Sequence, residues 1–166
     1  MRSIVVVAHN LRSAHNVGSL LRTADGMGVN RVYLTGYTPY PTDDNDLRLP
    51  YLAKKIHQQI AKTALGAEAL AIWEHADNVS SVFQKLRDNN YLICALEQAD
   101  GAIRLPDFEP PQKIALVVGR EVEGIEPEIL KQCHKIVQIP MLGNKESYNV
   151  VQAAAMALYH CRYFKA

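Results

Sequence analysis

Residues 3–35 read SIVVVAHNLRSAHNVGSLLRTADGMGVNRVYLT and carry the clearest fold signal in the chain. The stretch opens with Ser3–Ala8, an apolar run typical of strands that are buried on both faces of a parallel sheet. A polar turn follows, and the apolar spacing of Val17–Met27 predicts a helix. Arg31–Thr35, with the sequence RVYLT, predicts the next strand. The stretch therefore predicts a strand, a helix and a second strand.

The same alternation continues to the end of the chain. Further strands are predicted at Leu70–Glu74, Tyr91–Leu96, Ile114–Val118 and Val137–Pro140, and further helices at Tyr51–Ala64, Val79–Asn89, Pro127–Gln132 and Val150–Phe164. Strands separated by helices imply an α/β domain with a mostly parallel sheet flanked by helices. Because ligands bind beyond the carboxyl ends of such strands, we expect the site among residues 9–18, 36–50, 97–104, 119–125 and 141–149.

Length and composition indicate one domain that spans residues 1–166, because 166 residues with 48% hydrophobic content suffice for a single core. The first ten residues, MRSIVVVAHN, do not resemble a signal peptide, and no apolar run approaches the roughly 20 residues of a membrane span. Cys94, Cys133 and Cys161 are odd in number and form no CxxC pattern, which argues against disulfides and a zinc site. We expect a cytoplasmic protein without a bound metal.

The net charge is only +1, but the charges are unevenly distributed along the chain. Residues 1–62 hold eight Lys and Arg against four Asp and Glu, and residues 131–166 hold five against one. The middle, residues 63–130, holds five against twelve. If the two ends meet in space, they form a basic face suited to phosphate contact. The alternative is that these differences are incidental surface charge.

Two short segments combine polar residues with glycine where a predicted strand ends. The first, residues 16–24 (NVGSLLRTA), holds Asn16, which we expect to cap the helix, and Arg22 within the helix. The second, residues 119–124 (GREVEG), follows the strand IALVV, and Gly119 permits a close backbone approach to a ligand. Each segment alone also fits an ordinary capped helix or a glycine turn.

A third segment, residues 139–150 (IPMLGNKESYNV), leads into the alanine-rich helix VVQAAAMALY. Ser147 and Asn149 are residues typical of helix starts. The run Ala153–Ala155 allows another backbone to approach closely. A capped core helix would explain the alanines, but it would not explain the polar glycine loop that precedes them.

In this order and spacing, the three segments resemble the SpoU/TrmH branch of the SPOUT methyltransferases. Members of that family carry an N-x-G-x-x-x-R-T-A start, a G-x-E-x-x-G middle and an I-P-M…S-x-N-V end, and all three are present between residue 16 and about residue 155. The resemblance implies an α/β fold with a C-terminal trefoil knot, here over residues 94–155. It also implies S-adenosylmethionine as cofactor and a homodimer.

Transferred onto this sequence, the resemblance assigns roles to individual residues. The residues implied in catalysis are Arg22, Asn16, Glu121, Ser147 and Asn149. The residues implied in cofactor binding are Leu96, Gly119, Ile139, Leu142 and Ser147. The sequence departs from the family pattern at Tyr148, where Leu is more usual, and at residues 151–152.

The implied reaction is methyl transfer from S-adenosylmethionine to a ribose 2′-hydroxyl of RNA. Family models make the arginine a general base, yet a guanidinium is normally permanently charged. We therefore expect Arg22 to clamp the 3′-phosphate and to stabilise the developing alkoxide. In the dimer, Arg22 of one subunit would face the cofactor held by the other.

Several alternatives stay open at this stage. The chain is close to a bare catalytic core, which favours tRNA over rRNA as substrate, and residues 36–50 with Lys54, Lys55 and Lys62 are candidate RNA contacts. A cofactor-binding RNA-assembly factor without activity and a base-modifying methyltransferase are rival functions. An oxidoreductase ranks last, because no GxGxxG fingerprint follows the first strand.

Overall fold

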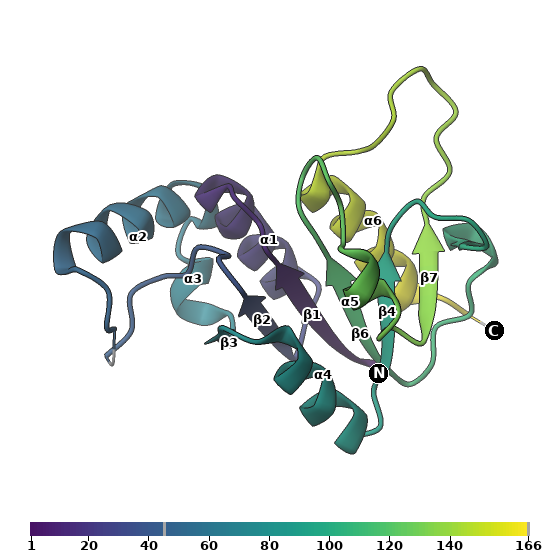
Figure 1. The fold of residues 1–166 in the computed structure, drawn as a ribbon, viewed down its shortest axis with the longest axis horizontal. Coiled ribbons are helices and arrows are strands. Elements are labelled where there is room, and N and C mark those ends of the chain that lie inside the picture. The colour runs from purple at the N-terminus through teal and green to yellow at the C-terminus, as the bar shows by residue number, and fades with distance from the viewer. Residues whose placement is uncertain (45, 166) are drawn as a thin grey trace.

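The computed structural model describes residues 1–44 and 46–165. Helices and strands alternate along most of the chain, as Figure 1 shows. The strands are β1 (Ser3–His9), β2 (Arg31–Thr35), β3 (Trp73–Ala76), β4 (Leu92–Leu96), β5 (Ile103–Arg104), β6 (Lys113–Val118) and β7 (Lys135–Gln138). The α-helices are α1 (Ala14–Gly26), α2 (Pro50–Ala64), α3 (Ala67–Leu70), α4 (Val79–Asp88), α5 (Pro127–Leu130) and α6 (Val150–Tyr163).

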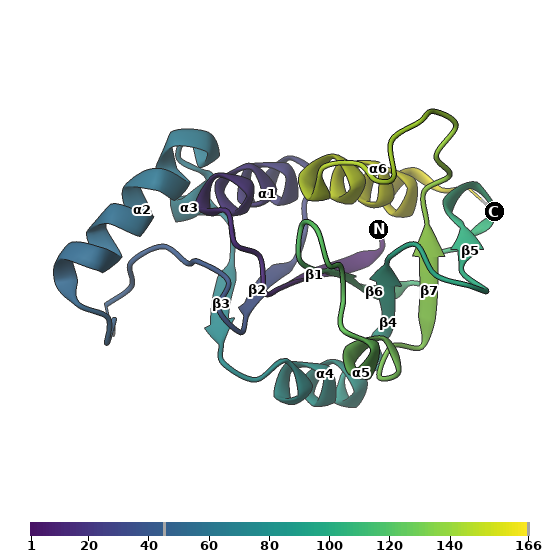
Figure 2. The ribbon, with the colours of Figure 1, turned by 45° about the horizontal axis from the view of Figure 1, so that its top comes forward.

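The seven strands form one sheet in the order β3-β2-β1-β6-β4-β7-β5, and every neighbouring pair is parallel. Near the centre, Val6 of β1 is in register with Val32 of β2 and Leu116 of β6. Figure 2 shows α1 and α6 on one face of this sheet and α4 and α5 on the other. The predicted α/β class with a parallel sheet flanked by helices is confirmed. The trefoil knot stays a prediction of the resemblance.

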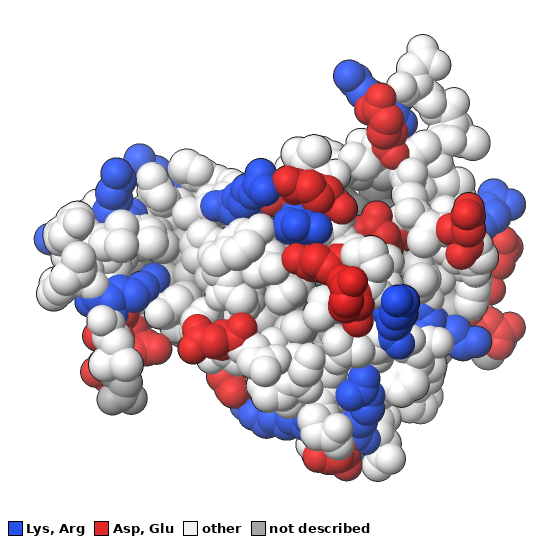
Figure 3. All heavy atoms as spheres, in the orientation of Figure 1, with Lys and Arg blue, Asp and Glu red and all other residues white. Residues whose placement is uncertain are grey.

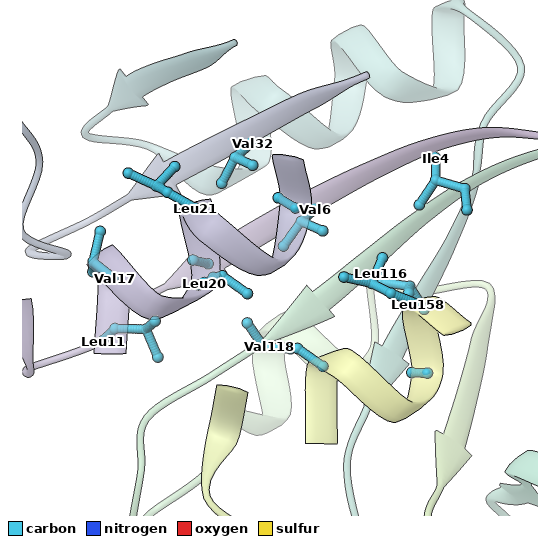
Figure 4. Close-up of a cluster of buried hydrophobic side chains, with 14 of the residues drawn as sticks. Ile4, Val6, Leu11, Val17, Leu20, Leu21, Val32, Leu116, Val118 and Leu158 are labelled. Carbon is cyan, nitrogen blue, oxygen red and sulfur yellow. The ribbon is translucent and has the colours of Figure 1, made fainter. Parts of the chain in front are cut away.

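The apolar run of β1 is continuous because both faces of the sheet are covered. Ile4 and Val6 belong to the hydrophobic cluster that α1 and α6 help to form, whereas Val5 and Val7 belong to the cluster with Phe83 of α4. Figure 4 shows the first cluster, with side chains of β1, β2, β6, α1 and α6 gathered between the sheet and the helices. Each such side chain stabilises the fold by about 1.5–3 kcal/mol when fully buried.

Helix α1 begins earlier than its sequence pattern predicts. Its N-cap is Ser13, whose side chain accepts a hydrogen bond from the backbone N–H of Asn16 at 3.2 Å. The prediction that Asn16 caps this helix was wrong, because the helix already starts at Ala14. Asn16 lies instead in the first turn, where its side-chain amide reaches residues from other parts of the chain.

Two further strands are shifted relative to the prediction, and one strand was not predicted. The strand expected at Leu70–Glu74 is Trp73–Ala76, because residues 67–70 form the short helix α3. The strand expected at Val137–Pro140 is Lys135–Gln138, and it ends before Pro140, which has no N–H to donate to a neighbouring strand. The two-residue strand β5 was not predicted, since a run of two residues shows no alternation.

The two ends of the chain meet, but they use their arginines for structure. Arg2 donates to the backbone carbonyls of Pro110 at 3.0 Å and Phe164 at 2.9 Å. Arg162 donates to the carbonyls of Arg2 at 2.6 Å and Gly28 at 2.7 Å. Both guanidinium groups at this junction are therefore bonded to backbone carbonyls.

The three cysteines are free thiols in hydrophobic surroundings. Burial raises the pKa of Cys133 to about 11 and that of Cys161 to about 12, and it raises the pKa of Cys94 as well. The thiols therefore stay protonated at neutral pH and make poor nucleophiles.

Among the described residues, every helix is too short or too polar to span a membrane.

Candidate active site at the carboxyl edge of the sheet

A pocket lies where β4, β6 and β7 end, at the carboxyl edge of the sheet. This is the edge at which ligands bind in parallel sheets. Its walls combine apolar side chains with the glycine-containing loop after β6 and the residues that lead into α6. The lining residues are Leu96, Glu97, Gln98, Val118, Gly119, Arg120, Glu121, Val122, Gly124, Ile139, Ser147, Tyr148, Val150 and Ala153.

Four of the five residues that the resemblance implies in cofactor binding line this pocket. They come from three separate segments of the chain: Leu96, Gly119, Ile139 and Ser147. Leu142 does not line it, since its side chain points into solvent and is 97% exposed. Among the residues implied in catalysis, Glu121 also lines the pocket, whereas Asn16, Asn149 and Arg22 lie outside its lining.

Glycine is required at two positions of the loop that follows β6. A Cβ atom on Gly119 would lie 2.6 Å from Ile125 Cγ1 and 2.9 Å from the carbonyl carbon of Gly124. Gly124 has φ of +70°, and a Cβ there would collide with the carboxylate of Glu97. That carboxylate accepts a hydrogen bond from the N–H of Ile125 at 2.9 Å. The glycines thus let the loop fold tightly against the end of β4 and shape one wall of the pocket.

A hydrogen-bonded chain joins the three segments that the resemblance identified. Asn16 Nδ2 donates to Glu121 Oε1 at 3.0 Å, and Asn149 Nδ2 donates to Asn16 Oδ1 at 3.3 Å. Asn149 is also the N-cap of α6, because its Oδ1 accepts from the N–H of Val151 at 2.9 Å. The expectation that Asn149 starts this helix is confirmed. Residues that are 133 positions apart in the sequence therefore meet beside the pocket.

Glu121 supports the start of α1 with its carboxylate. The backbone N–H groups of Arg12 and Ser13 donate to it, each at 3.2 Å, in addition to Asn16. Burial alone raises the pKa of Glu121, but these hydrogen bonds outweigh burial and lower the pKa below its usual value. The side chain is therefore ionised at neutral pH and places a fixed negative charge on the pocket wall.

Arg22 lies on the exposed face of α1, about 9 Å along the helix axis from Asn16. Within residues 1–44 and 46–165 its side chain makes no hydrogen bond and no ion pair. One turn before it, Gly18 allows α1 to pack closely on α2, because a Cβ there would collide with the carbonyl oxygen of Ile60. A guanidinium held on a rigid helix without a partner is available to a ligand.

A second polar network, which the sequence did not suggest, lies next to the pocket. The buried His9 pairs through Nδ1 with Thr35 Oγ1 at 2.9 Å, and its Nε2 lies 3.6 Å from Glu126 Oε2. Asn10 Nδ2 donates to Glu126 Oε1 at 2.9 Å. Burial lowers the pKa of His9, although the charge of Glu126 offsets part of that effect. His9 is therefore neutral at neutral pH.

Glu97 and Arg120 also line the pocket, although no sequence motif pointed to them. Both follow the last residues of buried strands, in segments 97–104 and 119–125 that were expected to hold the site. The available signal was thus their position immediately after a strand. Neither residue type was distinctive enough to stand out without the three-dimensional arrangement.

These features define an α/β protein with a ligand pocket at the carboxyl edge of its parallel sheet, built by a glycine loop and the start of the last helix. The chain belongs to the SpoU rRNA methylase family, whose model matches residues 3–159. A Staphylococcus epidermidis protein assigned to the TrmH family of tRNA/rRNA methyltransferases is 28% identical over 157 residues. That match covers 95% of this chain and 57% of the relative, so the chain spans little more than half the relative's length.

Solved structures are similar in fold over nearly the whole chain. The A. aeolicus TrmH/SpoU tRNA modifying enzyme aligns with a TM-score of 0.79 at 23% identity and covers 98% of this chain and 75% of that one. An AdoMet-bound rRNA methyltransferase from Sinorhizobium meliloti has a TM-score of 0.79 at 20% identity, covering 99% and 57%. An RNA 2′-O ribose methyltransferase has a TM-score of 0.78 at 25% identity, covering 96% and 55%.

Proposed function

We propose that this chain transfers a methyl group from S-adenosylmethionine to a ribose 2′-hydroxyl of RNA, and that it does so as a homodimer. The observation that carries the proposal is the hydrogen-bonded chain Glu121–Asn16–Asn149, because it joins all three motif segments beside one pocket. Similar folds in an AdoMet-bound rRNA methyltransferase and an RNA 2′-O ribose methyltransferase support the donor and the acceptor.

The pocket lining fits such a cofactor. Leu96, Val118 and Ile139 offer apolar surface for an adenine ring, and the ends of the strands offer backbone donors and acceptors for its edge. The carboxylates of Glu97 and Glu121 provide negative charge for a sulfonium and an ammonium group. When bound, the cofactor supplies a methyl group on a positively charged sulfur, which is already a strong electrophile.

The protein's main task is then to position the acceptor. Holding the 2′-hydroxyl in line with the methyl group supplies several kcal/mol of the barrier through orientation alone. We assign Arg22 the role of holding the adjacent RNA phosphate and stabilising the developing alkoxide. Because a guanidinium stays protonated, the hydroxyl proton leaves late, to water or to the phosphate.

The position of Arg22 supports a site shared between two subunits. Arg22 is exposed on α1 and lies outside the pocket lining of its own chain. The neighbouring helix α6 presents exposed tyrosines at 159 and 163 to the outside, and Ala155 on the same helix is half-buried. A second copy packed on this face would cover apolar surface and bring its own Arg22 towards the pocket.

The RNA substrate is expected to lie over the basic side of α1 and α2. Figure 3 shows Lys and Arg side chains over α2 and beside α1. The candidate RNA contacts in α2, Lys54, Lys55 and Lys62, are all exposed, so RNA can reach them. We favour tRNA over rRNA as the substrate, although the fold is shared equally with a tRNA modifying enzyme and an rRNA methyltransferase.

Mixing two inactive variants tests the shared site. Arg22→Ala removes the group that holds the RNA phosphate and should lower methyl transfer about 100- to 1000-fold. Ser147→Trp places a bulky ring in the pocket and should block cofactor binding, and because Ser147 is exposed the fold should tolerate it. Random reassociation of the two variants should restore about a quarter of the wild-type activity, since one site in every mixed dimer is intact. Mixed dimers without activity would show that each chain completes its own site.

Identifying the product tests the acceptor and the substrate. Mass spectrometry of tRNA and rRNA from a deletion strain should show one 2′-O-methyl nucleotide missing from tRNA. Loss from rRNA would correct the substrate, and a methyl group on a base would contradict the acceptor. If a radiolabelled methyl donor is bound but never consumed with any RNA fraction, the chain is an assembly factor without catalytic activity.

A further inference from the structure

Arg120 is the single basic side chain among the described residues that line the pocket. It follows Gly119 at the end of β6 and is only about a quarter exposed, with a side-chain exposure of 24%. Its neighbours in the lining are the apolar Val118 and Ile139 and the acidic Glu97 and Glu121. A buried arginine in such a pocket requires a counter-ion or strong acceptors.

The near end of the guanidinium is anchored by the protein. Arg120 Nε donates to the carbonyl oxygen of Gly124 at 3.1 Å and lies 3.7 Å from Glu126 Oε1. The backbone reinforces this arrangement, because Gly124 N–H donates to the carbonyl of Arg120 at 3.2 Å. Glu126 is held in turn by Asn10 Nδ2 at 2.9 Å. The network of His9, Asn10 and Glu126 therefore fixes the direction of the arginine.

The far end of the guanidinium has no partner. Within residues 1–44 and 46–165, neither Nη atom of Arg120 donates a hydrogen bond. The pocket carboxylates do not supply one, because Glu97 accepts from the N–H of Ile125 and Glu121 accepts from the start of α1. A fixed guanidinium with free Nη donors is suited to bidentate binding of a carboxylate or a phosphate.

We propose that Arg120 binds the carboxylate at the methionine end of the cofactor. This inference rests on the proposed function and assigns one subsite within the same pocket. Charge complementarity supports this assignment. The carboxylates of Glu97 and Glu121 would face the sulfonium and the ammonium group of the cofactor, and Arg120 would face its carboxylate. We favour this carboxylate over an RNA phosphate because Arg120 is three-quarters buried within the lining, whereas Arg22 is exposed.

Two ligands that differ in the amino-acid end test the subsite by calorimetry. S-Adenosylhomocysteine keeps the carboxylate, and 5′-methylthioadenosine lacks the whole amino-acid end. Arg120→Gln should weaken binding of the first about 10- to 100-fold and change binding of the second less than about twofold. Arg120→Lys should recover part of the loss, because lysine keeps the charge without the planar fork.

Arg12→Gln is the matched control. Arg12 is another arginine next to this loop, where it pairs with Glu123, but it lies outside the pocket lining. Its substitution should leave the affinity for both ligands unchanged. Circular dichroism and thermal melting of each variant establish that the fold is retained.

Each remaining outcome has a definite meaning. Wild-type protein that binds neither ligand contradicts the proposed function itself. Wild-type binding of S-adenosylhomocysteine with an equal affinity in Arg120→Gln overturns only the subsite. Equal weakening of both ligands also overturns it, because the effect would then lie in the pocket wall. Unchanged cofactor affinity with weaker RNA binding would reassign Arg120 to a phosphate.

Discussion

Two long loops of this molecule follow strands of the same sheet and precede helices, yet they are built in different ways. The first, residues 36–49, joins β2 to α2, and its residue 45 lies outside the described part. The second, residues 139–149, joins β7 to α6 and carries the last motif segment. Residues of the first loop make hydrogen bonds within the loop and to neighbouring parts of the chain, whereas residues 140–148 of the second make none within the described residues.

Arg48 organises the first loop. Its guanidinium donates to Asp46 Oδ1 at 2.8 Å and to the carbonyls of Tyr40 at 2.9 Å and Pro41 at 3.0 Å. The same group lies 3.6 Å from the centre of the Tyr40 ring, which stacks on His75 at 4.0 Å. Hydrogen bonds from Arg48 lower the pKa of Asp46 to about 2. The loop is thus held by Arg48 and by side chains outside it, such as His57 of α2, which bonds to Thr42.

The second loop has no comparable centre. Within the described residues, none of residues 140–148 makes a hydrogen bond, and residues 142–149 are all exposed. Only its last residue, Asn149, is tied to the body through Asn16. The first loop is thus fixed by contacts within the chain, while the loop beside the pocket has donors and acceptors left for a ligand or a second subunit.

The largest expected effect is on stability in the first loop. Arg48→Ala should lower the free energy of unfolding by about 3 kcal/mol, because it leaves the partly buried Asp46 and two carbonyls without their partner. The matched change in the second loop, Lys145→Ala, should stay within about 0.5 kcal/mol. Urea denaturation of both variants measures the difference. Similar losses in the two variants would show that Arg48 does not hold the first loop more firmly than Lys145 holds the second.

Alanine at one glycine of each loop should give a smaller but still clear contrast. Gly36 has φ of +65°, and a Cβ there would collide with Asn10 Oδ1. Gly36→Ala should therefore cost about 2 kcal/mol. A Cβ on Gly143 has no atom within 4 Å, so Gly143→Ala should change stability by less than about 0.5 kcal/mol. Thermal melting of the pair tests this, and a costly Gly143→Ala would show that the second loop is tightly packed.

The smallest expected effect is a pH dependence of the free energy of unfolding that comes from His9, next to the start of the first loop. Because burial lowers the pKa of His9 in the folded state, the unfolded chain binds more protons below about pH 6.5. Unfolding free energy should thus fall, by about 1 kcal/mol or less, as the pH drops from 7 to 5. His9→Gln should flatten this slope. An unchanged slope would assign the pH dependence to other groups.

Sequence patterns predicted most of the fold, and the family resemblance pointed to four residues that line the candidate pocket. The apolar runs of β1 and β6 are continuous because both sheet faces are covered, and that continuity is visible without a structure. Leu96, Gly119, Ile139 and Ser147 line one pocket as their motif positions suggested, although Leu142 does not. Short elements such as β5 and the start of α1 were missed, because they depend on contacts and caps rather than on periodicity.

The sequence alone determined the alternation of strands and helices, the parallel sheet and the segments that hold the site, because burial and glycine leave local patterns. The three-dimensional arrangement brings Asn16 to Glu121 and Asn149, makes Ser13 the N-cap of α1, and places Arg120 in the pocket lining with Nε bonded to Gly124. The physical reason is that hydrogen bonds and ion pairs between distant segments depend on the direction and distance of side chains in space. Neither quantity is encoded in the local spacing of residues.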